Sequence, residues 1–133
     1  MSNAANTVTV AGNLTKDPEL RSLPSGQAAT AFPVAVNRRW QNQATREWEE
    51  ETSYFDVVCW GDLARNVAES ATRGTRCIVT GRLTQRRWDS AEGDKRSTVE
   101  ITADDVALSL RFATATATKA TRVAATPNGA ALA

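Results

Sequence analysis

Residues 52–61 constrain the fold of this chain more than any other stretch. Within seven positions they hold three of the chain's eight aromatic residues. Successive side chains of a β-strand point to opposite faces, so a strand here has two faces of different character. One face is wholly apolar and consists of Phe55, Val57 and Cys59. The other consists of Tyr54, Asp56, Val58 and Trp60. We therefore expect a strand with its first face in the core and a second face on which flat groups stack.

The composition predicts a single folded domain that binds rather than catalyses. The chain has 133 residues, 41% of them apolar, and its Val, Thr and aromatic residues recur in short runs, as in β-rich proteins. It contains no His, which removes the commonest general base and imidazole metal sites. We expect no enzyme activity, no cofactor and no metal. There is neither a run of ~20 apolar residues nor an N-terminal signal segment, so we expect a cytoplasmic protein without membrane contact.

The two cysteines, Cys59 and Cys77, are not spaced as a metal-binding pair. In a cytoplasmic protein, buried free thiols are the expected state of such residues. A disulfide within or between subunits is left open by the sequence.

The remaining segments predict short strands and one helix in a definite order. A strand is expected from residue 7, with a bend at 12–13, a turn that starts at 17–18 and a resumed strand at 19–23. Further strands are expected at 28–39, 52–61, 77–88, 97–102 and 106–112. Apolar residues at helical spacing follow Asp62, a suitable N-cap, and Gly74 is suited to the C′ position. Pro33 cannot donate to a ladder, so we expect it at an edge or an irregularity. The polar residues 40–50 predict an extended, mobile hairpin.

This order of elements predicts an all-β OB-fold. Such a fold is a five-stranded barrel, here with one short helix between its third and fourth strands. We assign the domain to residues 1–112. Residues 113–133 are mostly Ala and Thr and contain no aromatic residue, so they cannot bury enough apolar surface to offset their ordering entropy. We expect them to form a disordered tail.

Aromatic and basic residues coincide at several places outside the expected core. Trp40 follows Arg38 and Arg39, and Trp88 follows Arg86 and Arg87. Trp60 precedes Arg65, which lies early in the helix expected to follow. Single-stranded nucleic acid requires this mixture, because cations neutralise phosphates while rings accept unpaired bases at ~1–3 kcal/mol each. Every base has a π-face, so such binding hardly depends on base sequence. The candidate binding residues are Trp40, Tyr54, Trp60, Trp88, Arg38, Arg39, Arg86 and Arg87.

Other interpretations stay open at this point. By strand parity alone, Tyr54 and Trp60 fit core or rim packing as well as binding. Trp48 lies among glutamates that repel phosphate, so we interpret it as loop packing or a contact between subunits. The net charge is +1 overall and −1 over residues 1–112, so a polyanion site requires segregated charge. An OB-fold module that binds oligosaccharides, or one that binds proteins, is the alternative function.

Several motifs together resemble the bacterial single-stranded DNA-binding protein family. They are NTVTVAGNLTKDPELR at 6–21, FDVVCWGDLARNVA at 55–68, RGT at 73–75 and GRLTQRRW at 81–88. The segment VNRRW at 36–40 resembles the actinobacterial branch of the family. The resemblance extends over roughly residues 6–112.

The resemblance implies a homotetramer of OB-folds that wraps single-stranded DNA without sequence preference in replication, recombination or repair, associated with the nucleoid. It places the stacking rings at Trp40, Tyr54, Trp60 and Trp88. It places phosphate contacts at Arg73, Arg86 and Arg87. Tyr54 stands where other members often have Trp.

Two features depart from the family pattern. Asp56 and Asp62 occupy positions that are basic in some members, which reduces the cationic charge expected around the third strand. The family's acidic C-terminal tip, which recruits other enzymes, has no counterpart in residues 113–133, which contain no Asp or Glu. We therefore expect a secondary paralogue whose tail does not recruit replication or repair enzymes.

Overall fold

The computed structural model describes residues 4–121. Its strands follow the alternation of apolar and polar residues, and its one helix follows the segment with helical spacing. In chain order the elements are β1 (Val8–Leu14), β2 (Glu19–Ser22), β3 (Ala28–Gln41), β4 (Trp48–Trp60), α1 (Gly61–Ser70), β5 (Arg76–Asp89) and β6 (Lys95–Leu108).

Five of the strands close a barrel. β1 pairs with β5, β5 with β6, β6 with β4 and β4 with β3, and β3 returns to β1 where Leu14 pairs with Val34. These pairs are antiparallel except for β4 and β6, which run parallel where Val57 pairs with Ile101. The helix α1 stands between the third and fourth barrel strands, β4 and β5. The predicted OB-fold is therefore confirmed.

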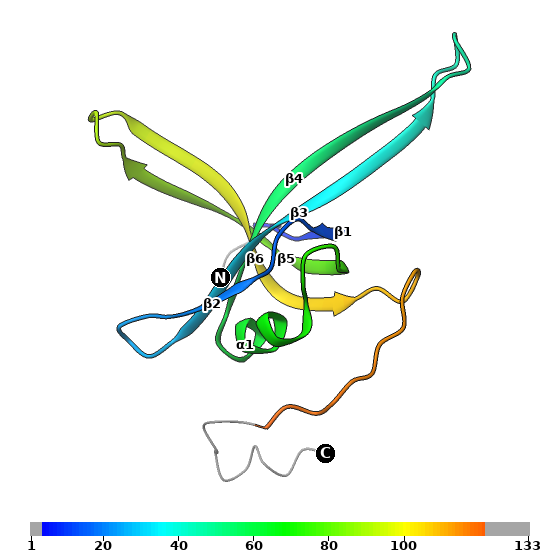
Figure 1. Cartoon of the computed structure of the whole chain (residues 1–133). Helices are drawn as coiled ribbons and strands as arrows, with labels where there is room; N and C mark the ends of the chain where they lie inside the picture. Colours follow the sequence, from blue (N-terminus) through cyan, green and yellow to red (C-terminus); the bar gives the residue numbers. More distant parts are fainter. Residues whose placement is uncertain (1–3, 122–133) are drawn as a thin grey trace.

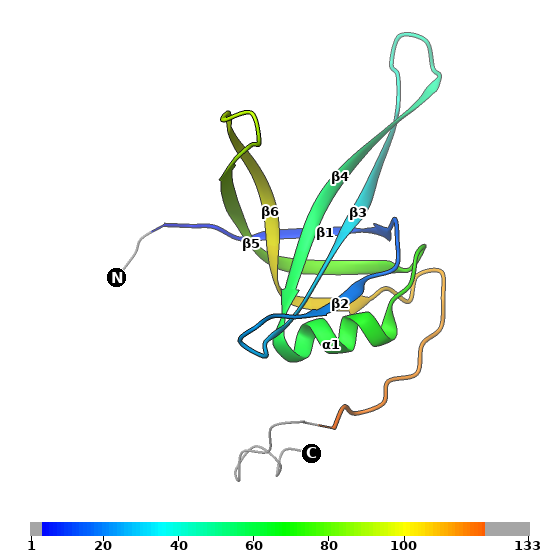
Figure 2. The same cartoon turned by 60° about the vertical axis from the view of Figure 1, so that its left-hand side comes forward.

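Two long hairpins extend beyond the barrel as arms (Figure 1). In one arm β3 and β4 stay paired out to Gln41 and Trp48, and in the other β5 and β6 stay paired out to Asp89 and Lys95. The extended hairpin predicted at 40–50 is the tip of the β3–β4 arm. Figure 2 shows both arms at one end of the barrel and α1 lying across the other end.

The core is built from the inward-facing side chains of the barrel strands. The largest fully buried side chains are Phe32, Leu14, Ile101, Val34, Val57, Val79, Thr30, Cys59 and Cys77. Burying one aliphatic or aromatic side chain of this size stabilises the fold by ~1.5–3 kcal/mol. The prediction that Phe55 also belongs to the core is wrong, because its side chain is 38% exposed. β4 pairs with β6 only at Val57 and Val58, so at Phe55 the strand has left the barrel wall.

The predicted start of the helix is wrong by two residues. Trp60, still extended, is the N-cap, and Gly61 turns the chain into α1 with a φ of 66°. Asp62 therefore lies in the first helical turn instead of capping it, and its carboxylate forms an ion pair with Arg65 at 2.8 Å. An acidic side chain in the first turn is favourable beside the positive end of the helix dipole.

The predicted end of the helix is also wrong. α1 ends at Ser70, and its C-cap is Ala71, whose N–H donates to the carbonyl of Val67 at 2.9 Å. Gly74 belongs to a later turn, where its φ is 91° and its N–H donates to the carbonyl of Leu14 at 2.8 Å. This glycine thus ties the loop after α1 to the end of β1.

The first predicted strand is interrupted as expected, with β2 in the segment predicted to resume it at 19–23. β3 changes neighbour from β2 at Ala31 to β1 at Val34. Pro33 lies at this change, which confirms its expected irregular position, and its carbonyl accepts the N–H of Thr15 at 3.1 Å. The two strands predicted at 97–102 and 106–112 are instead one strand, β6, because a register shift beside Gly81 lets the pairing with β5 continue.

Close backbone approaches explain two of the glycines. A Cβ on Gly12 would overlap with the carbonyl oxygen of Ala35 on β3. A Cβ on Gly81 would overlap with the carbonyl oxygen of Thr102 on β6. Both positions therefore require the absence of a side chain where strands come together in the barrel.

The chain after β6 carries no regular structure in its described part. Residues 113–121 are exposed and form neither helix nor strand. The rest of the tail predicted to be disordered, 122–133, lies outside the described residues, so that disorder stays a prediction. Within residues 4–121 no helix is both long and apolar enough to cross a membrane.

Replacing Gly81 with Ala tests the close approach at the β5–β6 register shift. We expect G81A to lower the free energy of unfolding by about 1–3 kcal/mol, because the backbone of β6 must move to admit the methyl group. T80A is the matched control, since its exposed side chain makes only a hydroxyl contact with Thr9. Urea denaturation measures both, and a G81A chain as stable as T80A would contradict the close approach.

The two cysteines are buried free thiols, as expected. Burial raises the pKa of Cys59 to about 12, with a further contribution from the nearby Cys77. Burial raises the pKa of Cys77 to about 11, against a small lowering by Arg76. The folded state therefore favours the neutral thiol at both positions, and thiolate chemistry is suppressed.

These thiols predict both a reactivity and a pH dependence. At pH 8 a disulfide reagent should label neither Cys59 nor Cys77 until the protein is denatured. Burying the neutral thiols contributes its full stabilisation of the fold below the unfolded-state pKa of about 8.5. This contribution is lost as pH rises toward 11–12, because the unfolded chain gives up its thiol protons first, at up to ~1.4 kcal/mol per thiol per pH unit. The slope of unfolding free energy between pH 8.5 and about 10 should be smaller in a double Cys→Ala variant, and equal slopes would contradict the assignment.

Candidate nucleic-acid interface

Strand pairing divides the sheet into an inner face, toward the core, and an outer face. On β4 the outer face carries Tyr54, Asp56, Val58 and Trp60, as predicted. On β5 it carries Arg82, Thr84, Arg86 and Trp88, which alternate with inward positions. β6 joins the two strands, because Thr102 pairs with both Val58 of β4 and Arg82 of β5. These residues therefore belong to one continuous surface, called the outer face below.

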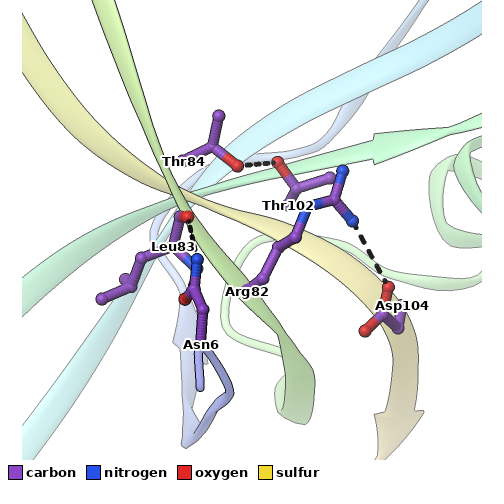
Figure 3. Close-up of polar contacts among 6 residues, drawn as sticks. All are labelled: Asn6, Arg82, Leu83, Thr84, Thr102 and Asp104. Carbon is purple, nitrogen blue, oxygen red and sulfur yellow. Dashed lines mark hydrogen bonds and ion pairs between the residues drawn. The ribbon is translucent and has the colours of Figure 1, made fainter. Parts of the chain in front are cut away.

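Polar contacts hold the β5–β6 part of this surface (Figure 3). The hydroxyls of Thr84 and Thr102 share a hydrogen bond of 2.8 Å across the two strands. Beside them, the side chain of Asn6 donates to the carbonyl of Leu83 and accepts its N–H, both at 2.9 Å. The chain before β1 is thereby fixed to β5 at the base of the arm.

Three of the predicted rings lie on the outer face and are exposed to solvent. The exposed fraction is 68% for Tyr54, 41% for Trp60 and 45% for Trp88. These values exclude the alternative that Tyr54 and Trp60 are core residues. Each ring therefore offers surface to a flat ligand without any unfolding of the barrel.

A groove on the outer face brings a predicted ring and a predicted cation together. Its volume is about 800 Å³. Trp60 and Arg86 contribute to its wall from β4 and β5, with Asp56 and Val58 between them. Its other charged lining residues are Lys16, Asp17, Glu19, Arg21 and Glu100. Sequence reasoning missed Lys16 and Arg21, because only the pairing of β2 with β3 brings their segment beside β4.

A second hollow lies at the tip of the β5–β6 arm. It has a volume of about 500 Å³ and is lined by Arg87, Trp88, Asp89, Lys95, Arg96 and Ser97. Arg86 packs over the ring of Trp88, with its guanidinium 5.4 Å from the ring centroid. Arg96 pairs directly with Trp88 across the strands, so it is a further cation of the outer face that the sequence reading missed. Counting residues back from the turn at 91–94 gives this pairing.

The remaining predicted residue of this arm, Arg87, lies on the inner face of β5. Its guanidinium donates to the side-chain oxygen of Gln85 at 2.8 Å. It lines the hollow at the tip together with Trp88. The arm tip therefore carries cations on both of its faces.

The structure places Trp40 and Arg38 on the inner face of the β3–β4 arm. Trp40 pairs with Glu49 and Arg38 with Glu51, and this face continues that of the buried Val34. Arg38 packs over the Trp40 ring at 4.7 Å from its centroid, and the ring is half-buried. Trp40 therefore does not share a face with Tyr54 and Trp60, although the sequence reading grouped the three.

The neighbouring Arg39 lies on the outer face, where it meets Trp48. Its guanidinium is 4.8 Å from the centroid of the Trp48 ring, which is 59% exposed. The expected loop packing of Trp48 is thus a contact with Arg39. Arg39 is paired across the strands with Glu50, an opposite charge on the same face.

Arg73 lies at one end of the outer-face groove. It follows α1, and its N–H donates to the carboxylate of Asp17 at 2.7 Å, where Asp17 lines the groove. Its side chain is exposed. Asp56 and Asp62 are the two acidic residues at positions that are basic in some family members. Asp56 lies in the groove, whereas Asp62 forms an ion pair with Arg65 on the helix.

The charges of this surface are mixed rather than uniformly positive. Arg82, beside the groove, lies 3.8 Å from the carboxylate of Asp104, an exposed ion pair worth at most ~1 kcal/mol (Figure 3). Within residues 4–121, no cluster of three or more His, Cys, Asp or Glu is placed to hold a metal ion. The surface offers aromatic rings and the charged side chains of Arg and Lys to a ligand.

The closed barrel and the ring-bearing outer face define an OB-fold protein with an extended binding surface. A solved structure, "Plasmodium falciparum SSB complex with ssDNA", matches with a TM-score of 0.72 at 20% identity, over 81% of this chain and 97% of that chain. At this level of identity the match supports the fold.

Sequence comparison supports a closer assignment. The single-stranded DNA-binding protein of Mycolicibacterium smegmatis is 50% identical over 117 residues, which cover 87% of this chain and 71% of that protein. The protein of the same name from Corynebacterium glutamicum is 49% identical over 109 residues, covering 81% of this chain and 48% of that protein. The profile of the single-strand binding protein family matches residues 5–109. The chain belongs to this family, and the resemblance seen in its motifs is confirmed.

Proposed function

We propose that this chain binds single-stranded DNA without sequence preference, by stacking unpaired bases on its outer-face rings and neutralising phosphates with Arg and Lys. The observation that carries the proposal is the groove in which Trp60 and Arg86 stand together on a face shared with Tyr54 and Trp88. The relatives named above are single-stranded DNA-binding proteins, which supports the same ligand here.

The outer face explains why base sequence matters little. A single DNA strand that follows the groove from Trp60 to the tip of the β5–β6 arm passes Arg86 before it reaches Trp88. Each stacked base contributes ~1–3 kcal/mol, and all four bases offer the same π-face. The phosphates of the DNA backbone are neutralised by cations at fixed distances from the rings, and these contacts are the same for every base.

Phosphate contacts come from cations around the rings rather than from a uniform patch. The proposed contacts are Arg86, Arg87, Arg73 and Arg39, as predicted from the sequence, together with Lys16, Arg21, Lys95 and Arg96. Trp40 and Arg38 join the site only where DNA passes around the edge of the β3–β4 arm onto its inner face. Asp56 opposes phosphate at the centre of the groove, so the cations act from its margins.

We also propose a homotetramer, as in the family pattern. β1 pairs with β5 along one edge, while from Val8 to Gly12 its other edge has no strand partner within residues 4–121. An unpaired strand edge is a template for pairing with a second copy. Ile78 of β5, which pairs with Ala11 of β1 and is 41% exposed, adds apolar surface beside this edge.

The proposed role is to protect single-stranded DNA, or hold it open, during replication, recombination or repair in the cytoplasm. Binding of this kind involves no bond making or breaking, so we assign the chain no catalytic activity.

Titration with oligo-dT at two salt concentrations tests the proposed function. Tryptophan fluorescence should be quenched as bases stack, and the affinity should fall as salt rises, since neutralised phosphates release counterions with a slope of about −0.7 per contact. Absence of quenching at low salt would contradict the proposal. Binding to a glycan panel without salt dependence would favour an oligosaccharide module instead.

Replacing Asp56 tests the electrostatics of the groove. D56N should raise the affinity for oligo-dT about two- to fivefold at low salt, because it removes a negative charge beside the phosphate path. The gain should shrink at high salt, where the charge is screened. E69Q, which removes the same charge from the helix outside the groove, is the matched control and should change little. An affinity of D56N equal to that of E69Q would show that DNA does not follow the groove.

A further inference from the structure

Trp48 occupies a position on the β3–β4 arm that the four-ring site does not include. The pairing of β3 with β4 runs without a register shift from Ala29–Trp60 to Gln41–Trp48. Strand parity is therefore kept along the whole arm, and Trp48, Tyr54 and Trp60 share the outer face. They recur every six residues, so neighbouring rings stand ~20 Å apart along β4 at the usual rise per residue. The arm presents a row of three rings.

The Trp48 ring is exposed and positioned at the same time. Its exposed fraction of 59% exceeds that of Trp60 or Trp88. Arg39 lies on the same face and packs over the ring at 4.8 Å from its centroid. A cation over one side of an indole is a favourable contact, so Arg39 restricts the motion of the Trp48 ring.

Hydrogen bonds order the tip of the arm beside this ring. Asn42 donates its N–H to the carbonyl of Glu47 and accepts that of Arg46, both at 2.8 Å. The Asn42 side chain also accepts the N–H groups of Ala44 and Thr45, and Gln41 donates its side-chain amide to the carbonyl of Arg46 at 2.9 Å. The turn is thus a defined structure, so the ring at its base loses little freedom on binding a ligand.

The acidic residues around Trp48 do not all face the ring. Parity directs Glu49 and Glu51 to the inner face, where they pair with Trp40 and Arg38. On the outer face Glu50 is paired across the strands with Arg39, so these two charges cancel locally. Two of the glutamates near Trp48 in the sequence, Glu49 and Glu51, therefore lie on the face of Trp40 instead.

We propose that Trp48, backed by Arg39, is a further base-stacking position that extends the row of Tyr54 and Trp60 along the arm. Its ligand is an unpaired nucleobase of a strand already bound in the groove, so this inference rests on the proposed function. Trp48 contributes a ring and almost no phosphate attraction. In this proposal Trp48 contacts DNA rather than a second subunit, the role that its sequence surroundings suggested.

Substitutions in the full chain, measured by oligo-dT titration, test the position. With an oligonucleotide of about 30 bases, long enough to cover more than one OB-fold site, W48A should lose about five- to a hundredfold in affinity. The loss should be equal at two salt concentrations, because a ring releases no counterions, whereas R86A should reduce the salt slope. W48F keeps a stacking ring, so it should bind within about twofold of wild type while the total tryptophan quenching falls.

W40A removes a ring from the opposite face of the same arm and reports whether DNA also passes around its edge, so a loss in both variants agrees with the proposal. If W48A binds as tightly as wild type, or if only W40A loses affinity, the proposal is overturned and DNA follows the inner face or leaves the arm. If W48A changes the mass of the DNA-free assembly by light scattering, Trp48 is a subunit contact and the proposal is also overturned. Failure of the wild-type chain to bind oligo-dT would instead overturn the proposed function.

Discussion

The pairing of β3 with β4 is the constraint on which the rest of the structure depends. It extends through thirteen residue pairs without a bulge. A slip by one residue would exchange the two faces of β4 completely, burying Tyr54 and Trp60 and exposing Val57 and Cys59. The burial of Val57 opposite Phe32 therefore fixes the core and the ring-bearing surface in a single choice of register. Pro33 is compatible with this long pairing because its missing N–H falls where β3 changes partner.

Closure of the barrel then turns two separate hairpins into one surface. The parallel contact of β4 with β6 is only two residue pairs long, yet it places Val58 beside Thr102 and so joins the outer faces of both arms. Gly81 allows the backbones of β5 and β6 to come together at this point, and the hydroxyl pair of Thr84 and Thr102 closes it from outside. Rings on different arms are consequently related by the barrel itself rather than by flexible loops.

The sequence predicts this architecture well where a pattern is local. Alternation placed Trp60 on the face opposite Phe55, Val57 and Cys59 but left its exposure open, and helical spacing found α1 while missing both of its ends. The sequence could not place Lys16 and Arg21 at the groove, because their position depends on the pairing of β2 with β3 rather than on any neighbouring residue. Residues 40–50 were predicted as a mobile hairpin without strand parity, so the separation of Trp40 from the face of Tyr54 and Trp60 was not foreseen. The exposure of Phe55 depends on where β4 leaves the barrel, which no period-two pattern encodes.

The balance between rings and charges on the outer face decides what kind of binding this surface supports. Its groove contains three basic and four acidic side chains, so long-range attraction for a polyanion is weak in spite of Arg86. Affinity must then come largely from contacts that form at short range, and rings that are already exposed and held by strands are suited to this. On the β3–β4 arm the same reasoning favours the face of Trp48 over that of Trp40. Beside Trp48 on its face stand one cation and one anion, Arg39 and Glu50. Trp40 is half-buried, and its face carries one cation, Arg38, and two anions, Glu49 and Glu51. A phosphate chain that approaches the arm meets less repulsion, and more open ring, on the outer side.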